Sequence, residues 1–191
     1  MPPFTVLAVC MGNICRSPMV ELLLLVAARD LVGDKADEVL YAHGGGTGSW
    51  HDGHRMDQGA ARQVRGRGGD PDRFRARYLR AEHVESSDLV ITATVEQSEY
   101  VERLVPGAGD RTFVLGELGR LLALVDPAGL PPVVVDPDAV YARGTAMVAA
   151  LHGARTGRSA GAADELDDPW GQGDRVFARV ADEVEGTVGS L

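Results

Sequence analysis

Short apolar runs alternate with longer helix-periodic segments over roughly the first two thirds of this chain. Runs rich in β-forming residues and bounded by turn residues predict strands at 4–9, 38–43, 87–94 and 111–115. Helical spacing of apolar residues predicts helices at 18–32, 56–64, 95–105 and 115–124. This alternation predicts an α/β fold, a three-layer sandwich in which helices cover both faces of a four-stranded, parallel, open sheet.

The pattern changes after residue 125, where prolines at 127, 131, 132 and 137 interrupt it. A helix rich in small residues is predicted at 138–153, a flexible loop at 154–163 and an amphipathic helix at 175–188. The length suits one domain, so we expect a single domain over 1–191 with an atypical insertion at about 125–163. The role of this insertion is open; a lid or a partner surface near the residues that follow it is the working hypothesis.

Composition narrows the class of protein. Apolar residues make up 45% and charged residues 25% of the chain, as in ordinary globular proteins, and the formal net charge is −9. An acidic chain lacks the basic surface expected of a nucleic-acid binder. No apolar run approaches the roughly 18 residues of a membrane span, and no basic segment precedes the apolar N-terminal run. We therefore expect a cytoplasmic protein without nucleic-acid or membrane partners; its oligomeric state stays open.

Candidate chemistry lies in the segment CMGNICRS, residues 10–17, between the first predicted strand and the first predicted helix. In parallel α/β sheets, ligands bind at the carboxyl ends of strands, where a helix N-terminus favours anions. Helix N-termini and nearby cations also favour the thiolate of a cysteine, which makes Cys10 a candidate nucleophile. Arg16 has the planar fork that holds two oxygens of a phosphoryl group. The segment therefore predicts a site for phosphoryl chemistry.

The other residues of this segment fit a phosphate-binding loop. Gly12 and Asn13 tolerate the left-handed backbone conformations that a tight loop needs, and the Ser17 hydroxyl is placed to stabilise the leaving Cys10 sulfur. Met11, Ile14 and Cys15 complete the loop. The structural alternative is that Cys10 is only a small buried hydrophobe at the end of a strand.

The stretch VCMGNICRSPMVE closely resembles the signature of low-molecular-weight protein-tyrosine phosphatases, most of all long bacterial, actinobacterial-like forms. The resemblance implies the phosphotyrosine phosphatase I-like fold and hydrolysis of phosphotyrosine proteins through a phosphocysteine, without a cofactor. It also implies a distant Asp-Pro pair that supplies a general acid. In LDDPWGQG (166–173), Asp168 directly precedes Pro169 and is our candidate; Asp167 is the competitor.

The resemblance also implies two aromatic walls beside the phosphate site. It places Trp50 at one wall of a phenyl-binding pocket and Trp170 at the opposite wall. The nearby residues His51, Asp52 and His54 lack a third well-spaced metal ligand, so we interpret them as solvated loop residues and expect no metal.

The resemblance covers about 4–119 and 166–188, with three departures. Gly44 and Phe74 stand where family members have a serine and a histidine that brace the loop asparagine, and Thr94 replaces an acidic residue. The effect of these changes on activity is open, as is a reversible disulfide between Cys10 and Cys15, which the resemblance makes plausible. A thiol-dependent arsenate reductase of the same fold and a weakly active phosphate- or phosphopeptide-binding homologue remain as alternatives.

Overall fold

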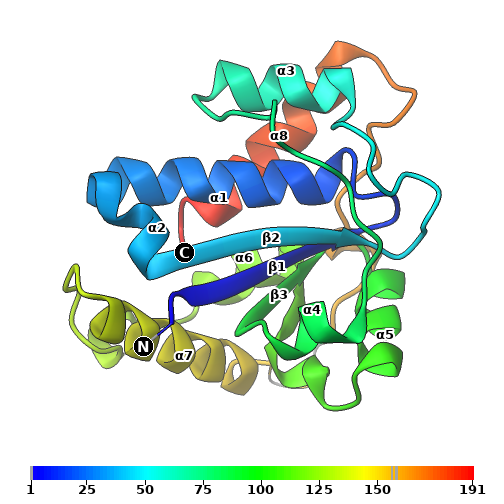
Figure 1. The fold of residues 1–191 in the computed structure, drawn as a ribbon. Coiled ribbons are helices and arrows are strands. Elements are labelled where there is room, and N and C mark those ends of the chain that lie inside the picture. The colour runs from blue at the N-terminus through cyan, green and yellow to red at the C-terminus, as the bar shows by residue number, and fades with distance from the viewer. Residues whose placement is uncertain (1, 156, 158) are drawn as a thin grey trace.

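The computed structural model describes residues 2–155, 157 and 159–191 (Figure 1). Four parallel strands form one sheet in the order β2-β1-β3-β4. The strands are β1 (Phe4–Cys10), β2 (Leu40–Gly46), β3 (Leu89–Thr92) and β4 (Thr112–Val114). Each strand starts or ends within three residues of its predicted bounds, which confirms the predicted α/β fold with a four-stranded parallel sheet.

Helices lie on both faces of this sheet (Figure 1). The longer ones are α1 (Arg16–Val32), α3 (Gln58–Gly66), α5 (Val95–Leu104), α6 (Leu115–Leu122), α7 (Pro137–Gly153) and α8 (Asp174–Val188). Helices α1, α3 and α8 pack together on one face, and α5 and the short α4 (Ala81–Glu85) lie on the other. The sheet is therefore covered by helices on both faces, as predicted.

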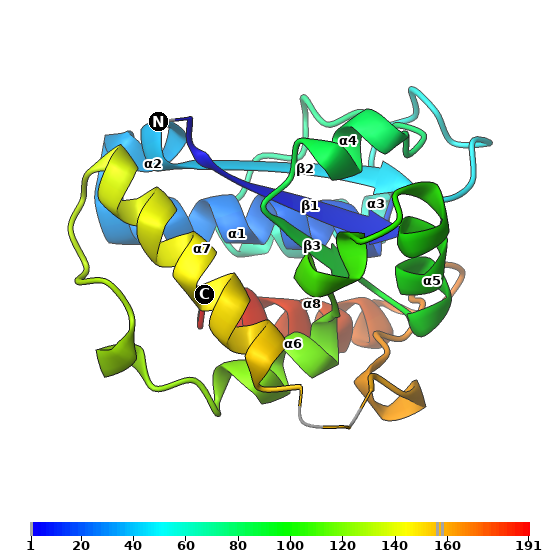
Figure 2. The ribbon, with the colours of Figure 1, turned by 90° about the horizontal axis from the view of Figure 1, so that it is seen from below.

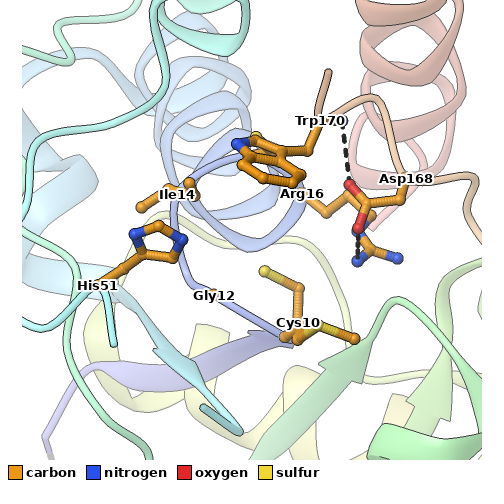
Figure 3. Close-up of a pocket in the computed structure, with 9 residues that line it drawn as sticks. Cys10, Gly12, Ile14, Arg16, His51, Asp168 and Trp170 are labelled. Carbon is orange, nitrogen blue, oxygen red and sulfur yellow. Dashed lines mark hydrogen bonds and ion pairs between the residues drawn. The ribbon is translucent and has the colours of Figure 1, made fainter. Parts of the chain in front are cut away.

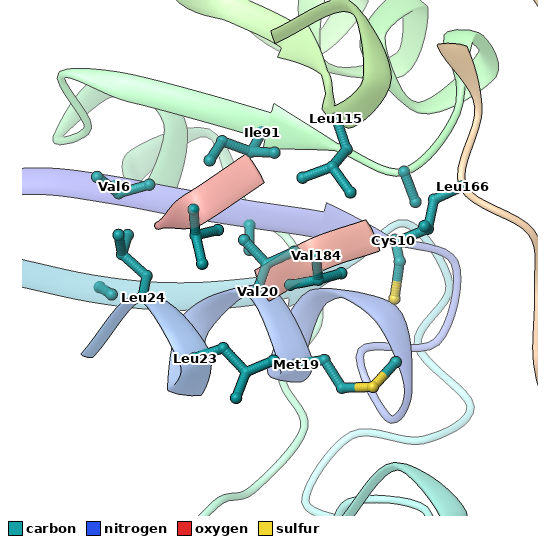
Figure 4. Packing of buried hydrophobic residues seen from close by; sticks show 14 of the residues in the cluster. Val6, Cys10, Met19, Val20, Leu23, Leu24, Ile91, Leu115, Leu166 and Val184 are labelled. Carbon is teal, nitrogen blue, oxygen red and sulfur yellow. The ribbon is translucent and has the colours of Figure 1, made fainter. Parts of the chain in front are cut away.

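Alternate residues of β1 enter two separate cores, as expected of a strand buried on both faces. Val6 and Ala8 belong to the large core under α1 and α8, together with Leu23 of α1 and Val184 of α8 (Figure 4). Leu7 and its neighbour Val9 belong to the smaller core on the opposite face. This burial fixes the end of β1, and therefore the position of the loop that follows it.

The largest departure from the predicted elements is at the start of β2. Glu38 and Val39 were predicted to be in a strand but lie in α2 (Ala36–Val39), a single helical turn after the short 3-10 helix Gly33–Lys35. The glycines at 44–46 were predicted to end the strand but form its last part, in register with the end of β1. A Cβ on Gly45 would lie only 3.0 Å from the Leu79 side chain and 3.3 Å from its Cα, so glycine lets these residues approach closely.

Helix α7, from the predicted insertion, crosses the molecule at the amino ends of the strands (Figure 2). Asp136 caps it by accepting hydrogen bonds from the backbone of residues 138 and 139, and Pro137 is its first residue. Phe4 at the start of β1 packs against Gly144, and Tyr141 donates to Asp88 just before β3. The helix is therefore at the opposite end of the strands from loop 10–17, and the lid hypothesis is wrong for this helix.

The segment that leaves α7 returns along the outer edge of β4. The side chain of Arg155 donates to the carbonyl of Thr112, and Glu117 accepts from the backbone N–H of Val114 at 3.3 Å. Arg155 and Glu117 also pair with each other at 2.9 Å, with Glu117 almost fully buried. Residues 156 and 158 of the predicted flexible loop 154–163 lie outside the described residues, and 162–164 form a turn of 3-10 helix, η4 (Ala162–Asp164).

Within the part of the chain that the structure describes, no helix combines the length and apolar character needed to cross a bilayer.

Candidate active site

Residues 10–17 connect β1 to α1 and curve around a small cavity of about 70 Å³ (Figure 3). Asn13 has a φ of 53°, in the left-handed region that few side chains other than asparagine tolerate. Gly12 also has no room for a side chain, because the His51 ring lies 2.8 Å from where its Cβ would be. The cavity is lined by Cys10, Met11, Gly12, Ile14, Cys15, Arg16, His51, Asp168 and Trp170.

A directed chain of hydrogen bonds ends at the Cys10 sulfur. The backbone N–H of Arg77 can only donate, and it donates to Asn13 Oδ1 at 2.9 Å. Asn13 Nδ2 must then donate to Ser17 Oγ, 2.8 Å away. Because Ser17 accepts this bond, its own proton is free for the Cys10 sulfur at 3.0 Å. The Asn13 backbone N–H is a second donor to the same sulfur, at 3.3 Å. Both donors favour a negatively charged sulfur.

This chain of bonds shows how the loop asparagine is held although Gly44 and Phe74 stand at the bracing positions. The backbone of Arg77 braces the loop asparagine, so Asn13 is held without the serine and histidine of the resemblance. A Cβ on Gly44 would lie 2.7 Å from Asn13 Nδ2 and 3.0 Å from Glu21 Oε2. The absence of a side chain at Gly44 therefore lets both groups lie close to its backbone. Phe74 is buried in the core. The site is braced by different groups rather than left unbraced.

The Arg16 guanidinium is buried and meets the segment before α8. Its Nη2 donates to Asp168 Oδ2 at 2.6 Å and its Nη1 to the carbonyl of Leu166 at 3.3 Å (Figure 3). Its buried Nε has no hydrogen-bond partner among the described residues. The Nε–H of Arg16 is therefore available to a ligand.

Thr94 stands where the family has an acidic residue. Its hydroxyl caps α5 by accepting a hydrogen bond from the backbone N–H of Gln97.

The two aspartates of the Asp-Asp-Pro stretch face different partners. Asp168 lines the cavity and pairs with Arg16, whereas Asp167 pairs with Arg179 of α8 at 2.6 Å. Asp167 is not among the residues that line the cavity. Only Asp168 is therefore within reach of a ligand held beside Cys10, a distinction that sequence reasoning alone left to the resemblance.

The walls of the cavity differ from the sequence-based expectation. Trp170 lines the cavity, but Trp50 does not: it is 60% exposed and folds over Gly48, whose Cβ would lie 2.1 Å from the Trp50 ring. His51 takes the place expected for Trp50, with its ring over Gly12. Sequence reasoning interpreted His51 as a solvated loop residue and missed it, although it is next to the expected tryptophan.

Cys15 in the loop and Glu21 in α1 have pKa values raised above their ordinary ones. Burial, reinforced by the charges of Asp57, Cys10 and Asp168, raises the pKa of Cys15 far above the ordinary value of a thiol, so Cys15 is a neutral thiol. Burial also raises the pKa of Glu21 to about 7, against the opposing effect of Arg77. Both cysteines are free.

Among the described residues no group of three or more histidine, cysteine or acidic side chains could hold a metal ion.

Comparisons with known proteins match this chain to phosphatases. A sequence model of the family described as low molecular weight phosphotyrosine protein phosphatase matches residues 5–120. The chain is 33% identical over 138 residues to the low molecular weight protein-tyrosine-phosphatase YfkJ of Bacillus subtilis. The matched stretch covers 72% of this chain and 81% of that protein. It is 30% identical over 132 residues to a protein-arginine-phosphatase of Geobacillus stearothermophilus, covering 68% and 82%.

Solved structures show the same fold. The low molecular weight protein tyrosine phosphatase from T. tengcongensis superimposes with a TM-score of 0.68, covering 98% of this chain and 97% of that one at 22% identity. The match to the family model ends near the end of α6, before α7 and before the segment that carries Asp168. The position of Asp168 therefore rests on the geometry described above.

Proposed function

The chain belongs to the low-molecular-weight phosphotyrosine protein phosphatase family, and on that premise we propose that Cys10, Arg16 and Asp168 carry out its hydrolysis of phosphomonoesters. The protein is a phosphoric monoester hydrolase of the protein-tyrosine-phosphatase type, as its homologues are. One observation supports the assignment above all: Asp168, far along the chain from Cys10 and Arg16, lines the same cavity as these two residues of the 10–17 loop.

In the first step, the Cys10 thiolate attacks phosphorus. The S–P bond forms as the P–O bond to the phenol breaks, and Asp168 gives its proton to the departing oxygen. Arg16 holds the phosphoryl oxygens, and its unpartnered Nε is the donor that a ligand oxygen would satisfy. The start of α1 adds the positive end of a helix dipole next to the same oxygens.

In the second step, water attacks the phosphocysteine. Asp168 takes a proton from this water, the S–P bond breaks, and phosphate leaves with the new P–O bond. The sulfur departs as a thiolate, which accepts hydrogen bonds from the Ser17 hydroxyl and the Asn13 backbone N–H. The relay from Arg77 through Asn13 keeps the Ser17 proton directed at the sulfur, so the leaving group is stabilised before it forms.

The substrate that suits this cavity is an aryl phosphate, with a phosphotyrosine protein as its natural form. Met11, Ile14 and Trp170 give the cavity apolar walls, and His51 adds a second ring. Apolar side chains complement a phenyl ring, whereas a phosphorylated guanidinium has polar N–H groups that these side chains cannot satisfy. We therefore favour phosphotyrosine over the phosphoarginine that the name of the Geobacillus relative indicates for that protein.

The remaining expectations are part of the proposal. We propose that residues 1–191 form one phosphatase domain, including the atypical segment at about 125–163. The reaction written above needs no metal or cofactor, because the nucleophile, the clamp and the acid are all side chains. Two buried free thiols suit a reducing compartment such as the cytoplasm.

Hydrolysis of p-nitrophenyl phosphate by purified variants tests the proposal. Cys10→Ser should have no turnover, and mass spectrometry of quenched wild type should find one phosphoryl group on Cys10. Asp168→Asn should lose about 10²- to 10⁴-fold in turnover of phenyl phosphate, the usual value of general acid catalysis. Asp167→Asn is the matched control and should stay within about twofold of wild type, since its exposed ion pair contributes little.

The same preparation separates the alternatives. Phosphotyrosine peptides should be cleaved, and phosphoarginine and phosphoserine peptides of the same sequence should not be. Thiol-dependent arsenate reduction without aryl phosphatase activity would instead identify the reductase alternative. Tight binding of phosphotyrosine with no turnover would identify the binding homologue, and either result would overturn the proposal.

A further inference from the structure

Each of the five residues from 164 to 168 is held by a different element, and we call this segment the acid strap. Three residues accept hydrogen bonds from arginines: Asp164 from Arg120 of α6, Asp167 from Arg179 of α8 and Asp168 from Arg16 of α1. Between them, Glu165 accepts from the Val95 N–H of α5, and the Leu166 N–H donates to the Ala93 carbonyl just after β3. The strap therefore takes its position from four helices and from the residue that follows β3.

These contacts differ in how well they are shielded from water. Arg120 donates two hydrogen bonds to Asp164, from Nε at 3.2 Å and from Nη2 at 3.1 Å, and the Asp164 side chain is 9% exposed. Arg179 and Asp167 have side chains 50% and 67% exposed. Exposed pairs contribute about 0–1 kcal/mol, whereas bidentate pairs with a buried partner hold both distance and direction. Of these two pairs, the one between Arg120 and Asp164 is thus the stronger anchor.

Helix α6 touches the strap at a second point, one turn before Arg120. A Cβ on Gly116 would lie 2.6 Å from the carbonyl oxygen of Asp164 and 2.8 Å from its Cα. These are backbone atoms, which cannot swing away as a side chain can. Gly116 therefore sets how closely the strap approaches α6, while Arg120 sets its position along the helix.

We propose that α6 positions the general acid, with Arg120 and Gly116 as positioning residues that act on Asp168 through Asp164. The inference rests on the proposed function of Asp168. Neither residue lines the cavity, and Asp168 is four positions after Asp164 in the chain, so both act through the strap. A shift of about 1 Å in a reacting group can cost about 10²-fold in rate, which makes such an anchor consequential.

The test compares two substrates that differ in their need for the acid. Phenolate is a poor leaving group and needs the proton of Asp168, whereas 2,4-dinitrophenolate leaves without one. Arg120→Met should lower kcat/KM about 10- to 100-fold with phenyl phosphate and less than about threefold with 2,4-dinitrophenyl phosphate. Arg179→Met is the matched control, and it should change kcat/KM for both substrates by less than about twofold.

A pair of glycine variants gives a second test that does not remove a charge. Gly116→Ala should push the strap and show the same selective loss with phenyl phosphate. Gly119→Ala, in the same helix, is its control, because a Cβ there would meet only the flexible Thr187 side chain at 3.2 Å. Alanine raises helix propensity by about 1 kcal/mol at either position, so a loss confined to Gly116→Ala reports the close approach.

The pattern of losses decides between the possible causes. Equal losses with both substrates would mean that Arg120 only supports folding, and no loss in either Arg120→Met or Gly116→Ala would overturn the inference. Adding Arg120→Met to Asp168→Asn should cause no further loss with phenyl phosphate. If Asp168→Asn itself costs nothing with phenyl phosphate, the proposed function of Asp168 fails; if it does cost turnover while the α6 variants do not, only the inference fails.

Discussion

Arg16 Nη2 and Asp168 Oδ2 lie 2.6 Å apart although 152 residues separate them in the chain. Arg16 is almost fully buried here, and the Asp168 side chain is 45% exposed. The Arg16 guanidinium is proposed to hold the phosphoryl group, and one of its donors, Nη2, is already hydrogen-bonded to the proposed acid, Asp168. A phosphoryl group that binds in the cavity has to compete with Asp168 for the same donors.

This competition predicts an effect on ligand binding. Asp168→Asn should bind inorganic phosphate about 1.4- to fivefold more tightly than wild type, because the variant removes an anionic partner whose partly exposed ion pair is worth about 0.2–1 kcal/mol. Competitive inhibition of residual turnover, or calorimetric titration with phosphate, measures the constant. Asp167→Asn should leave it unchanged, and weaker binding by Asp168→Asn would contradict the competition.

The cavity walls predict different effects at two adjacent residues. His51→Ala should lower kcat/KM for phenyl phosphate roughly two- to tenfold, mostly through KM, since one ring contact to an aromatic substrate contributes about 0.5–1.5 kcal/mol. Trp50→Ala should have less effect, because Trp50 folds over Gly48 outside the cavity. Steady-state kinetics on the two variants checks the order, and a larger effect of Trp50→Ala would contradict the observed wall.

The cysteines predict selective alkylation. Burial holds the Cys15 thiol neutral well above physiological pH, and a neutral thiol is a poor nucleophile. Iodoacetamide at pH 7 should therefore modify Cys10 alone, abolish activity, and do so more slowly in the presence of inorganic phosphate. Peptide mass spectrometry locates the adduct. Cys15→Ser should be inactivated at about the wild-type rate, whereas primary modification of Cys15 would contradict the assignment.

The buried Glu21 predicts a pH dependence of stability. Burial raises the pKa of Glu21 to about 7, from an ordinary value of 4.5, so the native state keeps a proton that the unfolded chain has released over this range. Its contribution is fully present below about pH 4.5 and is lost as the pH rises through 7, about 3 kcal/mol in all. The free energy of unfolding of Glu21→Gln should therefore exceed that of wild type increasingly from pH 5 to 8.

Urea titrations at several pH values measure this difference. His43 acts in the opposite direction, since burial and the charges of Arg77 and His83 lower the pKa of His43 to about 4, and its contribution is lost as the pH falls from 6.5 toward 4. Glu21→Gln and wild type both contain His43, so its effect cancels in the comparison. A difference between Glu21→Gln and wild type that is independent of pH would contradict the raised pKa.

Local features explain why the centre of the site could be predicted from the sequence. The 10–17 loop needs only a buried strand end, residues that tolerate a left-handed backbone, and a helix start, all within eight residues. The sequence predicted that Asn13 tolerates a left-handed backbone, and its φ of 53° confirms this. Ser17 within hydrogen-bond distance of Cys10 follows from the same short segment.

Tertiary contacts explain what the sequence could not predict. Whether Trp50 or His51 enters the cavity depends on which glycine each ring covers, Gly48 or Gly12, and these contacts do not follow from the order of residues. The N–H that braces Asn13 belongs to Arg77, 64 residues away, and a backbone donor has no sequence signature. Proline spacing showed that the segment after residue 125 was unusual but not that α7 would lie at the far end of the strands.

The contact of Arg155 and Glu117 with β4 has a consequence for self-association. Together they give Thr112 an N–H donor and Val114 an oxygen acceptor, the two groups that one residue of a fifth parallel strand would provide. An edge strand with unpaired groups is a template for another chain, and natural proteins block it with charges or cover it. Here one ion pair supplies the charges and also covers the edge. The carbonyl of Thr112 and the N–H of Val114 are therefore not available to pair with a strand of another chain.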